Sequence, residues 1–476
     1  MISTIIAALA ALSLEEVSTA LSPDDAREDL QTLYAGLAEA EADLFAQTPR
    51  TVFETRFSEL RARYDAPVPV DQLHADLQAF AALARHAHTR IEGLNPGWAA
   101  YQAESGPVFP LEIRIEDGEV IVAASAADDI RPGDRILALN GDTNPLWLER
   151  ITRHVSAETI DLAYAMIAGG DPYFVWLGLG PHHQFDITVE RAGETHDLTV
   201  PAVALDAWYE RETGDAGFSL TGREARTISD TITYLRPGDF YNIEAETAEA
   251  VYDPLALAAY TDWVDDIFLS AIETGTTDLI LDLRDNGGGD VSWSNPVVAW
   301  FADRPFNFAS DFRIRVSEQT TASNQARLDT YPPGEGGASA TMAELFEQAP
   351  IGDIVSFRMP DADPRPGPRF EGRVHVLVNR NSFSNAVTTA ALIQDYGFGC
   401  ICGEPTRDMA TTYGAMEHFT LPNSGFRVGY PKAHIIRPNG DEEPHPLAPD
   451  VILPVPVLRG SEDVTLNALI AHIDAT

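Results

Sequence analysis

The chain has 476 residues, enough for about three domains of ordinary size. Hydrophobic residues make up 45% and charged residues 22%, which is a globular composition and not that of a disordered chain. Asp and Glu number 73 against 32 Lys and Arg, giving a net charge of −41. Such a surface repels phosphate backbones, so the charge argues against nucleic-acid binding.

Residues 1–22 contain an apolar run, Ile5 to Leu14, and end close to a small-residue stretch. This pattern resembles a short signal peptide and predicts export to the periplasm or the outside. The run has no Lys or Arg before it and is followed by two glutamates, so a cytosolic helix start is the alternative. No apolar run reaches the ~18 residues that a membrane span needs.

Residues 23–104 are predicted to be helical. Apolar side chains recur at spacings of three and four, as a buried helix face requires. The residues that define this spacing are Leu73, Leu77, Phe80, Ala84 and His88. Asn95, Pro96 and Gly97 then interrupt the pattern.

Residues 105–204 change to short alternating strands. Asp117-Gly118 predicts a hairpin turn, and residues 130–141 (IRPGDRILALNG) join a Pro-Gly turn, a strand and an Asn-Gly turn. This last segment resembles the turn–strand–turn segment PGD-x-I-x-x-x-NG of PDZ domains. Residues 145–180 are longer and more helical than a minimal PDZ domain needs.

Residues 226–476 are predicted to form an α/β core, because apolar strand-like runs alternate with helical stretches. A weakly periodic insertion at about 305–370 is expected to be a surface loop or lid. Cys400 and Cys402 lie two apart in an apolar run, where strand geometry does not favour a disulfide, so buried thiols are expected.

Two segments of the core are chemically distinctive. In residues 282–289 (DLRDNGGG) an apolar strand ends in three glycines, which indicates either a tight turn or exposed N–H groups that form half of an oxyanion hole. In residues 376–385 (VLVNRNSFSN) a strand runs into a helix that starts near Ser384. Taken alone, Ser384 there is a typical helix cap.

Together the two segments resemble the core of the C-terminal processing and tail-specific serine peptidases and of the tricorn protease. Residues 394–397 (QDYG), 403–406 (GEPT) and 449–450 (PD) extend the resemblance. Aligned through QDYG, the family's nucleophile falls on Ser384, with Ser382 as the runner-up.

One departure from the family is informative. Many members use a Ser–Lys dyad, with the lysine 25 residues after the serine in a GEPT-x-GK context. Here that position is Met409, and the only lysine of the chain is Lys432. The dyad is therefore excluded in its usual place.

The tricorn-like branch implies a different base. Its histidine, at the end of the helical region, falls on His88, and its late glutamate falls on Glu443, with Glu442 as a rival. The serine that precedes the histidine in the tricorn core is Ala87 here. The chemistry is consistent, because a serine needs an adjacent base and a carboxylate can orient an imidazole.

The resemblance implies an N-terminal helical region, a PDZ-like domain and a crotonase/ClpP-like α/β peptidase core. It implies peptide hydrolysis through an acyl-enzyme, with an oxyanion hole from the N–H groups of Gly288 and Asn385. No metal or other cofactor is expected, and the expected partner is a peptide or protein, bound through a free C-terminus. The alternatives are a catalytically silent binding protein on the same scaffold and an esterase-like acyl hydrolase.

Overall fold

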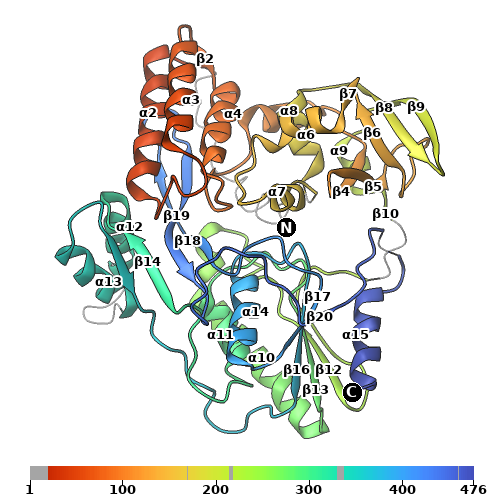
Figure 1. Ribbon diagram of the computed structural model, residues 1–476, viewed down its shortest axis with the longest axis vertical. Coiled ribbons are helices and arrows are strands. Elements are labelled where there is room, and N and C mark those ends of the chain that lie inside the picture. Colours follow the sequence, from red (N-terminus) through yellow and green to blue (C-terminus); the bar gives the residue numbers. More distant parts are fainter. Residues whose placement is uncertain (1–19, 169, 214–217, 330–336, 459) are drawn as a thin grey trace.

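The computed structural model describes residues 20–168, 170–213, 218–329, 337–458 and 460–476. The predicted signal segment, residues 1–22, lies almost wholly outside the described residues. Its last residue, Ser22, caps the first described helix by accepting the N–H of Asp25 at 3.2 Å. Figure 1 shows a helical bundle and a β-rich region side by side, above a core built on a parallel sheet.

The helical region follows the predicted pattern. Its elements are β1 (Ala20–Leu21), α2 (Pro23–Ala40), α3 (Arg50–Arg63), β2 (Val68–Pro69), α4 (Val70–Ala81), η1 (Ala82–Ala84), β3 (Arg90–Ile91) and α5 (Pro96–Ala103). The predicted apolar face is buried at Leu73, Leu77 and Phe80. His88 does not continue that helix, because Arg85 takes the left-handed conformation (φ 55°) and turns the chain away.

The β-rich region forms a seven-stranded sheet with helices packed against it. Its elements are β4 (Leu111–Glu116), β5 (Glu119–Ser125), β6 (Arg135–Leu139), β7 (Asp142–Thr143), α6 (Asn144–Thr152), α7 (Ile160–Ile167), α8 (Asp171–Leu179), β8 (Gln184–Arg191), β9 (Glu194–Pro201), α9 (Leu205–Tyr209) and β10 (Glu212–Thr213). Asp117-Gly118 turns β4 into β5, and Asn140-Gly141 turns β6 into β7, as predicted.

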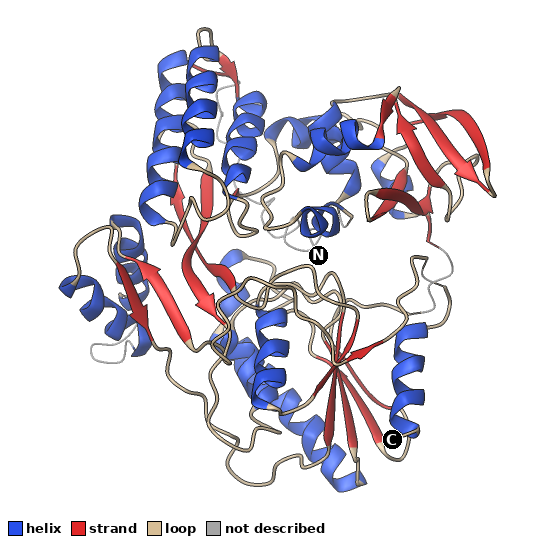
Figure 2. Cartoon of the chain, in the orientation of Figure 1, coloured by secondary structure: helices blue, strands red, loops and turns tan. Residues whose placement is uncertain are grey.

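The core sheet has the order β11-β12-β13-β16-β17-β20 and is parallel from β12 onward. Helices cover its faces, as buried parallel strands require (Figure 2). The elements are β11 (Glu224–Thr227), β12 (Ile232–Arg236), η2 (Ala248–Tyr252), α10 (Pro254–Thr274), β13 (Asp278–Asp282), α11 (Val291–Val298), β16 (Arg373–Val378), α14 (Asn385–Tyr396), β17 (Cys400–Gly403), β20 (Val451–Ile452) and α15 (Val464–Asp474). Cys400 and Cys402 are free thiols in β17, as expected.

The insertion expected to be a loop contains regular structure instead. It holds β14 (Asp311–Arg315), α12 (Glu318–Leu328), α13 (Gly337–Gln348) and β15 (Ile354–Phe357). Side chains of β14, α13 and β15 share an apolar cluster. A capping box between Ser317 and Thr320 starts α12 and stabilises a helix whose own periodicity is weak.

A long hairpin joins the helical region to the core. It consists of β18 (Thr412–Thr420) and β19 (Arg427–Ile436), and β19 also pairs with β3 through Val428 and Ile91. In Figure 1 this hairpin runs from the core toward the helices α2 and α4. It therefore fixes the segment that carries His88 against the core.

Within the described part of the chain, no helix is long and apolar enough to cross a membrane.

Candidate active site

The site forms where two neighbouring parallel strands end. β13 and β16 pair in register, with Leu281 opposite Val376, so the loops that follow them leave the same edge of the sheet. The two loops touch at Gly288, which has a φ of 92°. A Cβ atom there would lie 2.7 Å from Cβ of Ser384 and 2.8 Å from N of Asn385. Only glycine allows this approach.

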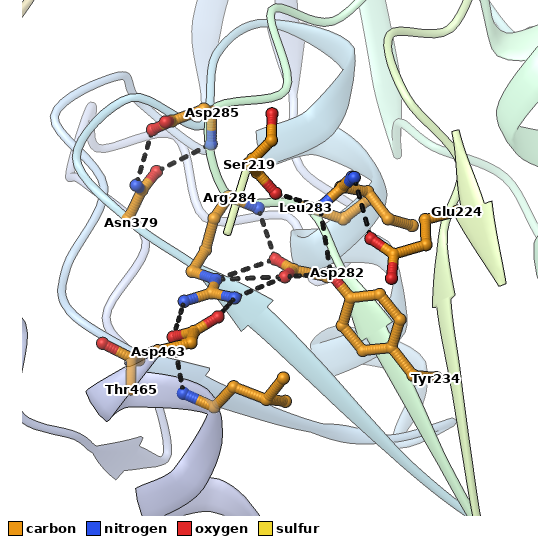
Figure 3. Close-up of polar contacts among 12 residues, drawn as sticks. Ser219, Glu224, Tyr234, Asp282, Leu283, Arg284, Asp285, Asn379, Asp463 and Thr465 are labelled. Atoms are coloured by element: carbon orange, nitrogen blue, oxygen red, sulfur yellow. Dashed lines mark hydrogen bonds and ion pairs between the residues drawn. The ribbon is translucent and has the colours of Figure 1, made fainter. Parts of the chain in front are cut away.

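A buried ion network holds the first of these loops (Figure 3). Arg284 Nη2 lies 2.6 Å from Asp282 Oδ2 and 2.7 Å from Asp463 Oδ2, so one guanidinium bridges the sheet and the start of α15. The Tyr234 hydroxyl donates to Asp282 Oδ2 at 2.8 Å. We call Asp282, Arg284 and Asp463 the paired cluster. Burial opposes ionisation of Asp463, but the hydrogen bonds from Arg284 lower the pKa of Asp463.

The two loops are also tied to each other. The N–H of Asp285 donates to Asn379 Oδ1 at 3.1 Å, and Asn379 Nδ2 donates to Asp285 Oδ1 at 2.8 Å (Figure 3). The Ser382 hydroxyl donates to the Leu283 carbonyl at 2.8 Å and is fully buried. Ser382, the alternative nucleophile, is therefore engaged in holding the loop.

The Ser384 side chain does not act as a helix cap. Ser384 precedes α14, yet its side chain caps none of the helix N–H groups, and its backbone has φ 52° and ψ −122°. Such a conformation is costly for a residue with a side chain and is typical of functional sites. Ser384 Oγ lies 3.1 Å from Nε2 of His88. The structure thus brings together the serine and the histidine that the sequence singled out.

His88 is enclosed by protein. It is 6% exposed, and its ring stacks on Phe383 with centroids 5.2 Å apart. Burial, with a smaller contribution from Arg90, lowers the pKa of His88 to about 4, so the ring is neutral at pH 7. Nδ1 has no well-aligned hydrogen bond among the described residues, although the backbone of Tyr413 is close enough to favour the charged ring.

His86 has the carboxylate that His88 lacks. Its Nδ1 lies 3.0 Å from Glu41 Oε2, and both side chains are fully buried. The Thr89 hydroxyl donates to the other Glu41 oxygen at 2.5 Å. His86 therefore anchors the loop, while His88 faces the serine.

Glu443 is not joined to His88 in this structure. Its side chain is exposed, and its backbone N–H donates to Asp441 Oδ1 in a turn that holds the loop outward. The rival Glu442 is bound by Arg313, with Nη2 2.7 Å from Oε1. Neither carboxylate contacts the His88 ring in the described part of the chain.

The two N–H groups expected to form the oxyanion hole differ in whether they already donate a hydrogen bond. The N–H of Gly288 donates to Asn286 Oδ1 at 2.8 Å and is engaged. The N–H of Asn385 is at the first position of α14, where no intrahelical acceptor exists. Asn385 N thus lies beside Ser384 as a donor without a hydrogen-bond partner among the described residues.

The single lysine of the chain, Lys432, is buried in an ion pair. Lys432 is 8% exposed, and its Nζ lies 2.7 Å from Glu417 Oε1, which also binds Arg327 at 2.5 Å. Met409, in the place of the dyad lysine, is buried. No lysine reaches Ser384.

Sequence reasoning missed a group of buried acids behind the Ser384–His88 contact. Asp408 accepts the N–H of Ser384 at 2.5 Å and that of Met409 at 2.8 Å. Glu158, from the β-rich region, accepts the N–H of Ala87 at 3.2 Å. We call Glu41, Glu158 and Asp408 the acid cluster. A signal for Asp408 existed, because it stands where the GEPT-x-GK context has glycine.

The acid cluster has no matching cation. Among the described residues, no lysine or arginine pairs with its carboxylates, and His86 is the one basic side chain that contacts any of them. Burial, with the neighbouring Glu158 second, raises the pKa of Asp408 to about 7. Burial also raises the pKa of Glu158. No group of three or more potential metal ligands occurs in the described ranges.

Residues 243–453 match the model of peptidase family S41, so this part of the chain is a serine peptidase domain, and the predicted family is confirmed. The search of curated proteins found no significant match to this sequence.

Solved structures agree in fold. Mature CPAF complexed with lactacystin has a TM-score of 0.65 and 14% identity, covering 95% of this chain and 97% of that one. Mature CPAF alone gives 0.61 and 14%, covering 94% and 96%. The photosystem II D1 C-terminal processing protease gives 0.42 and 18%, covering 91% and 95%. At such identities the likeness to CPAF shows a shared S41-type fold of mixed sheets and helices.

Proposed function

We propose that this chain, which carries a peptidase family S41 domain, cleaves peptide bonds with Ser384 as nucleophile and His88 as base. The observation that carries the proposal is the 3.1 Å separation of Ser384 Oγ and His88 Nε2. This is hydrogen-bond reach for a nucleophile and its base. The neutral state of the buried ring supports the same roles, because only a neutral imidazole accepts a proton.

The reaction follows from these roles. Ser384 Oγ attacks the carbonyl carbon of the scissile bond and passes its proton to His88 Nε2. The protonated ring then gives that proton to the leaving amine, and the C–N bond breaks to leave an acyl-serine. Water attacks the acyl carbon while His88 takes one of its protons, and return of that proton to Ser384 releases the new carboxyl group.

The oxyanion of each tetrahedral intermediate would be held by backbone N–H groups. Asn385 supports this role, because its N–H lies beside the serine and has no hydrogen-bond partner in the part of the chain that the structure describes. For Gly288 to contribute as well, its N–H must exchange Asn286 for the substrate oxygen. Glu443 as the orienting carboxylate remains a prediction; it needs movement of its exposed loop or a bridging water.

The finer architecture belongs to the same proposal. We take residues 23–104 as a helical region, 105–204 as a PDZ-like domain and 226–476 as a crotonase-like core. A PDZ-like domain would bind an extended peptide as an added strand, so a substrate with a free C-terminus and a site of action outside the cytoplasm are proposed with it.

The test is labelling with a fluorophosphonate, which reacts with an activated serine. We expect the full-length protein to be labelled, and Ser384→Ala to abolish labelling while the fold is retained. Ser58→Ala, at an exposed serine of α3, is the matched control and should label normally. Labelling of Ser384→Ala at the wild-type rate overturns the assignment, and no labelling of the wild type favours a silent binding protein. A panel of peptide and ester substrates separates a peptidase from an esterase.

A further inference from the structure

The strongest unassigned feature of the molecule is the fully buried Asp408 beside the nucleophile. Its two carboxylate oxygens accept the N–H groups of Ser384 and Met409, at 2.5 and 2.8 Å. Its own backbone carbonyl accepts the hydroxyl of Thr406 at 2.7 Å. The Thr406 hydroxyl thus fixes the backbone of Asp408, and the Asp408 carboxylate binds the backbone N–H of Ser384.

Ser384 needs such a partner. Its φ of 52° and ψ of −122° lie outside the regions that a residue with a Cβ prefers, and such conformations persist only when surrounding contacts impose them. The hydrogen bond from Ser384 N to Asp408 acts directly on the peptide plane that sets this conformation. Loss of that bond would allow Ser384 to relax and would move Oγ away from His88.

A second carboxylate acts on the histidine side. Glu158 Oε1 accepts the N–H of Ala87, the residue before His88, and the other Glu158 oxygen is buried without a partner among the described residues. The segment around it clamps the same loop, because Ser156 Oγ accepts the N–H of His86 at 3.0 Å. The Glu158 carbonyl also accepts Arg85 Nη2 at 3.1 Å.

We infer that Asp408 and Glu158 are positioning residues, an acid pair from two regions of the chain that fixes the backbone of Ser384 and of the His88 loop. This inference rests on the proposed function. It gives the β-rich region a part in the reaction, since Glu158 belongs to that region and Asp408 to the peptidase core.

The pair also makes the site sensitive to pH. Each oxygen of Asp408 accepts an N–H, so protonation of the carboxyl costs one of these bonds. The groups around it are Glu158, whose charge raises the pKa of Asp408, His88 beyond Ser384, and Arg407, which is turned toward Asp161 at 3.8 Å. Behind Glu158 lie His86 and Glu41. Because the pKa of His88 is about 4 and that of Asp408 about 7, a rise in rate near pH 7 is assigned to Asp408.

The experiment measures the rate of fluorophosphonate labelling of the full chain between pH 5 and 9. We expect the wild-type rate to rise through an ionisation near pH 7. Asp408→Asn should lower the rate at pH 8 at least tenfold and remove that rise. Glu158→Gln removes a neighbouring negative charge, so the rise should move to lower pH, with a smaller loss of rate. Asp474→Asn, at an exposed aspartate of α15, is the matched control and should leave both unchanged.

The outcomes separate the two proposals. A wild-type protein that is not labelled refutes the proposed function. A labelled wild type whose rate has no rise near pH 7, or whose rise survives unchanged in Asp408→Asn, refutes this inference alone. If Asp408→Asn does not fold, Glu158→Gln decides, because a purely structural glutamate would not shift the pH of the rise.

Discussion

The paired cluster and the acid cluster both bury carboxylates at the edge of the same site, but only one of them has a cation. In the paired cluster Arg284 binds both Asp282 and Asp463, and all three side chains are at most 13% exposed. In the acid cluster Glu41, Glu158 and Asp408 meet one histidine and several backbone N–H groups. The chain has a net charge of −41. Among the residues that the structure describes, one arginine pairs with the first cluster and none pairs with the second.

The difference indicates what each cluster does. Arg284 compensates part of the negative charge of the paired cluster, lowers the pKa of Asp463 and so stabilises the loop with that carboxylate charged. Burial raises the pKa of Asp408 and of Glu158 close to Ser384, which is a pattern found at functional sites. We expect substitutions in the first cluster to act mainly on folding, and substitutions of Asp408 and Glu158 in the second to act mainly on the site.

The largest effect should follow from Arg284→Met. The substitution leaves two buried carboxylates without their cation, which typically costs about 3–5 kcal/mol of folding free energy. Urea unfolding followed by circular dichroism measures it. Arg56→Met is the matched control, because Arg56 pairs with Glu59 at the surface of α3, where such pairs contribute about 1 kcal/mol or less. Equal losses in the two variants would contradict the role given to the paired cluster.

A smaller loss is expected for Glu41→Gln. Glutamine retains one acceptor oxygen for two buried donors, His86 and Thr89, so one of them loses its partner at about 1–3 kcal/mol. The thermal midpoint should fall relative to Glu39→Gln, an exposed neighbour on α2. A variant as stable as that control would show that the His86 anchor is dispensable.

The two clusters should respond to pH with opposite signs. The pKa of Asp463 is lowered, so its contribution to stability is present above the unfolded value and is lost as the pH falls below about 4. The pKa of Asp408 is raised to about 7, so its contribution is present below about 4 and is lost as the pH rises through 7. Between pH 5 and 8 the wild type should therefore lose stability relative to Asp408→Asn as the pH increases.

The measurement is the unfolding midpoint of each variant minus that of the wild type across the pH range. For Asp463→Asn, the stability advantage of the wild type should shrink on acidification from pH 6 to 3. If the difference in unfolding midpoint changes with pH in the same direction for both variants, the proposed contrast between the pKa shifts of Asp463 and Asp408 is wrong.

The smallest effect on rate is expected for Lys432→Met. Lys432 forms an ion pair with Glu417, which also pairs with Arg327. This group resembles the paired cluster, because its carboxylate is bound by cations. Its amine is bound to Glu417 and does not reach Ser384, so kcat/KM should stay within a few-fold of the wild type. A loss on the order of 10³ or more, typical of removing a base, would restore a lysine mechanism.

Sequence patterns pointed to Ser384 because it lies in a segment with strong local constraints. Ser384 follows a buried strand and begins a helix, and Gly288 follows the adjacent strand, so parallel pairing alone brings them to one edge. His88 came from the family pattern and not from periodicity, since Arg85 takes the chain out of the helix before it.

The acid cluster could not be predicted in the same way. Glu41, Glu158 and Asp408 lie in three segments far apart in the sequence, and each reads locally as a polar loop residue. Their burial results only from the packing of all three segments, which no local pattern encodes. The exposure of Glu443 could not be read from its sequence context either. That context matches the family, but the backbone N–H of Glu443 binds Asp441 and its side chain lies in solvent, so its orienting role stays a prediction.

The contact between His88 and Ser384 joins residues 296 positions apart. A ribosome makes the chain from its N-terminus, and early segments fold first. His88 is therefore synthesised long before Ser384, but it is enclosed only once Phe383, which stacks on its ring, has also been made. Asp463, which completes the support of the neighbouring loop, emerges later still. Any activity that needs both residues begins only after nearly the whole polypeptide has been made, so an unfinished chain cannot cleave itself or its neighbours during synthesis.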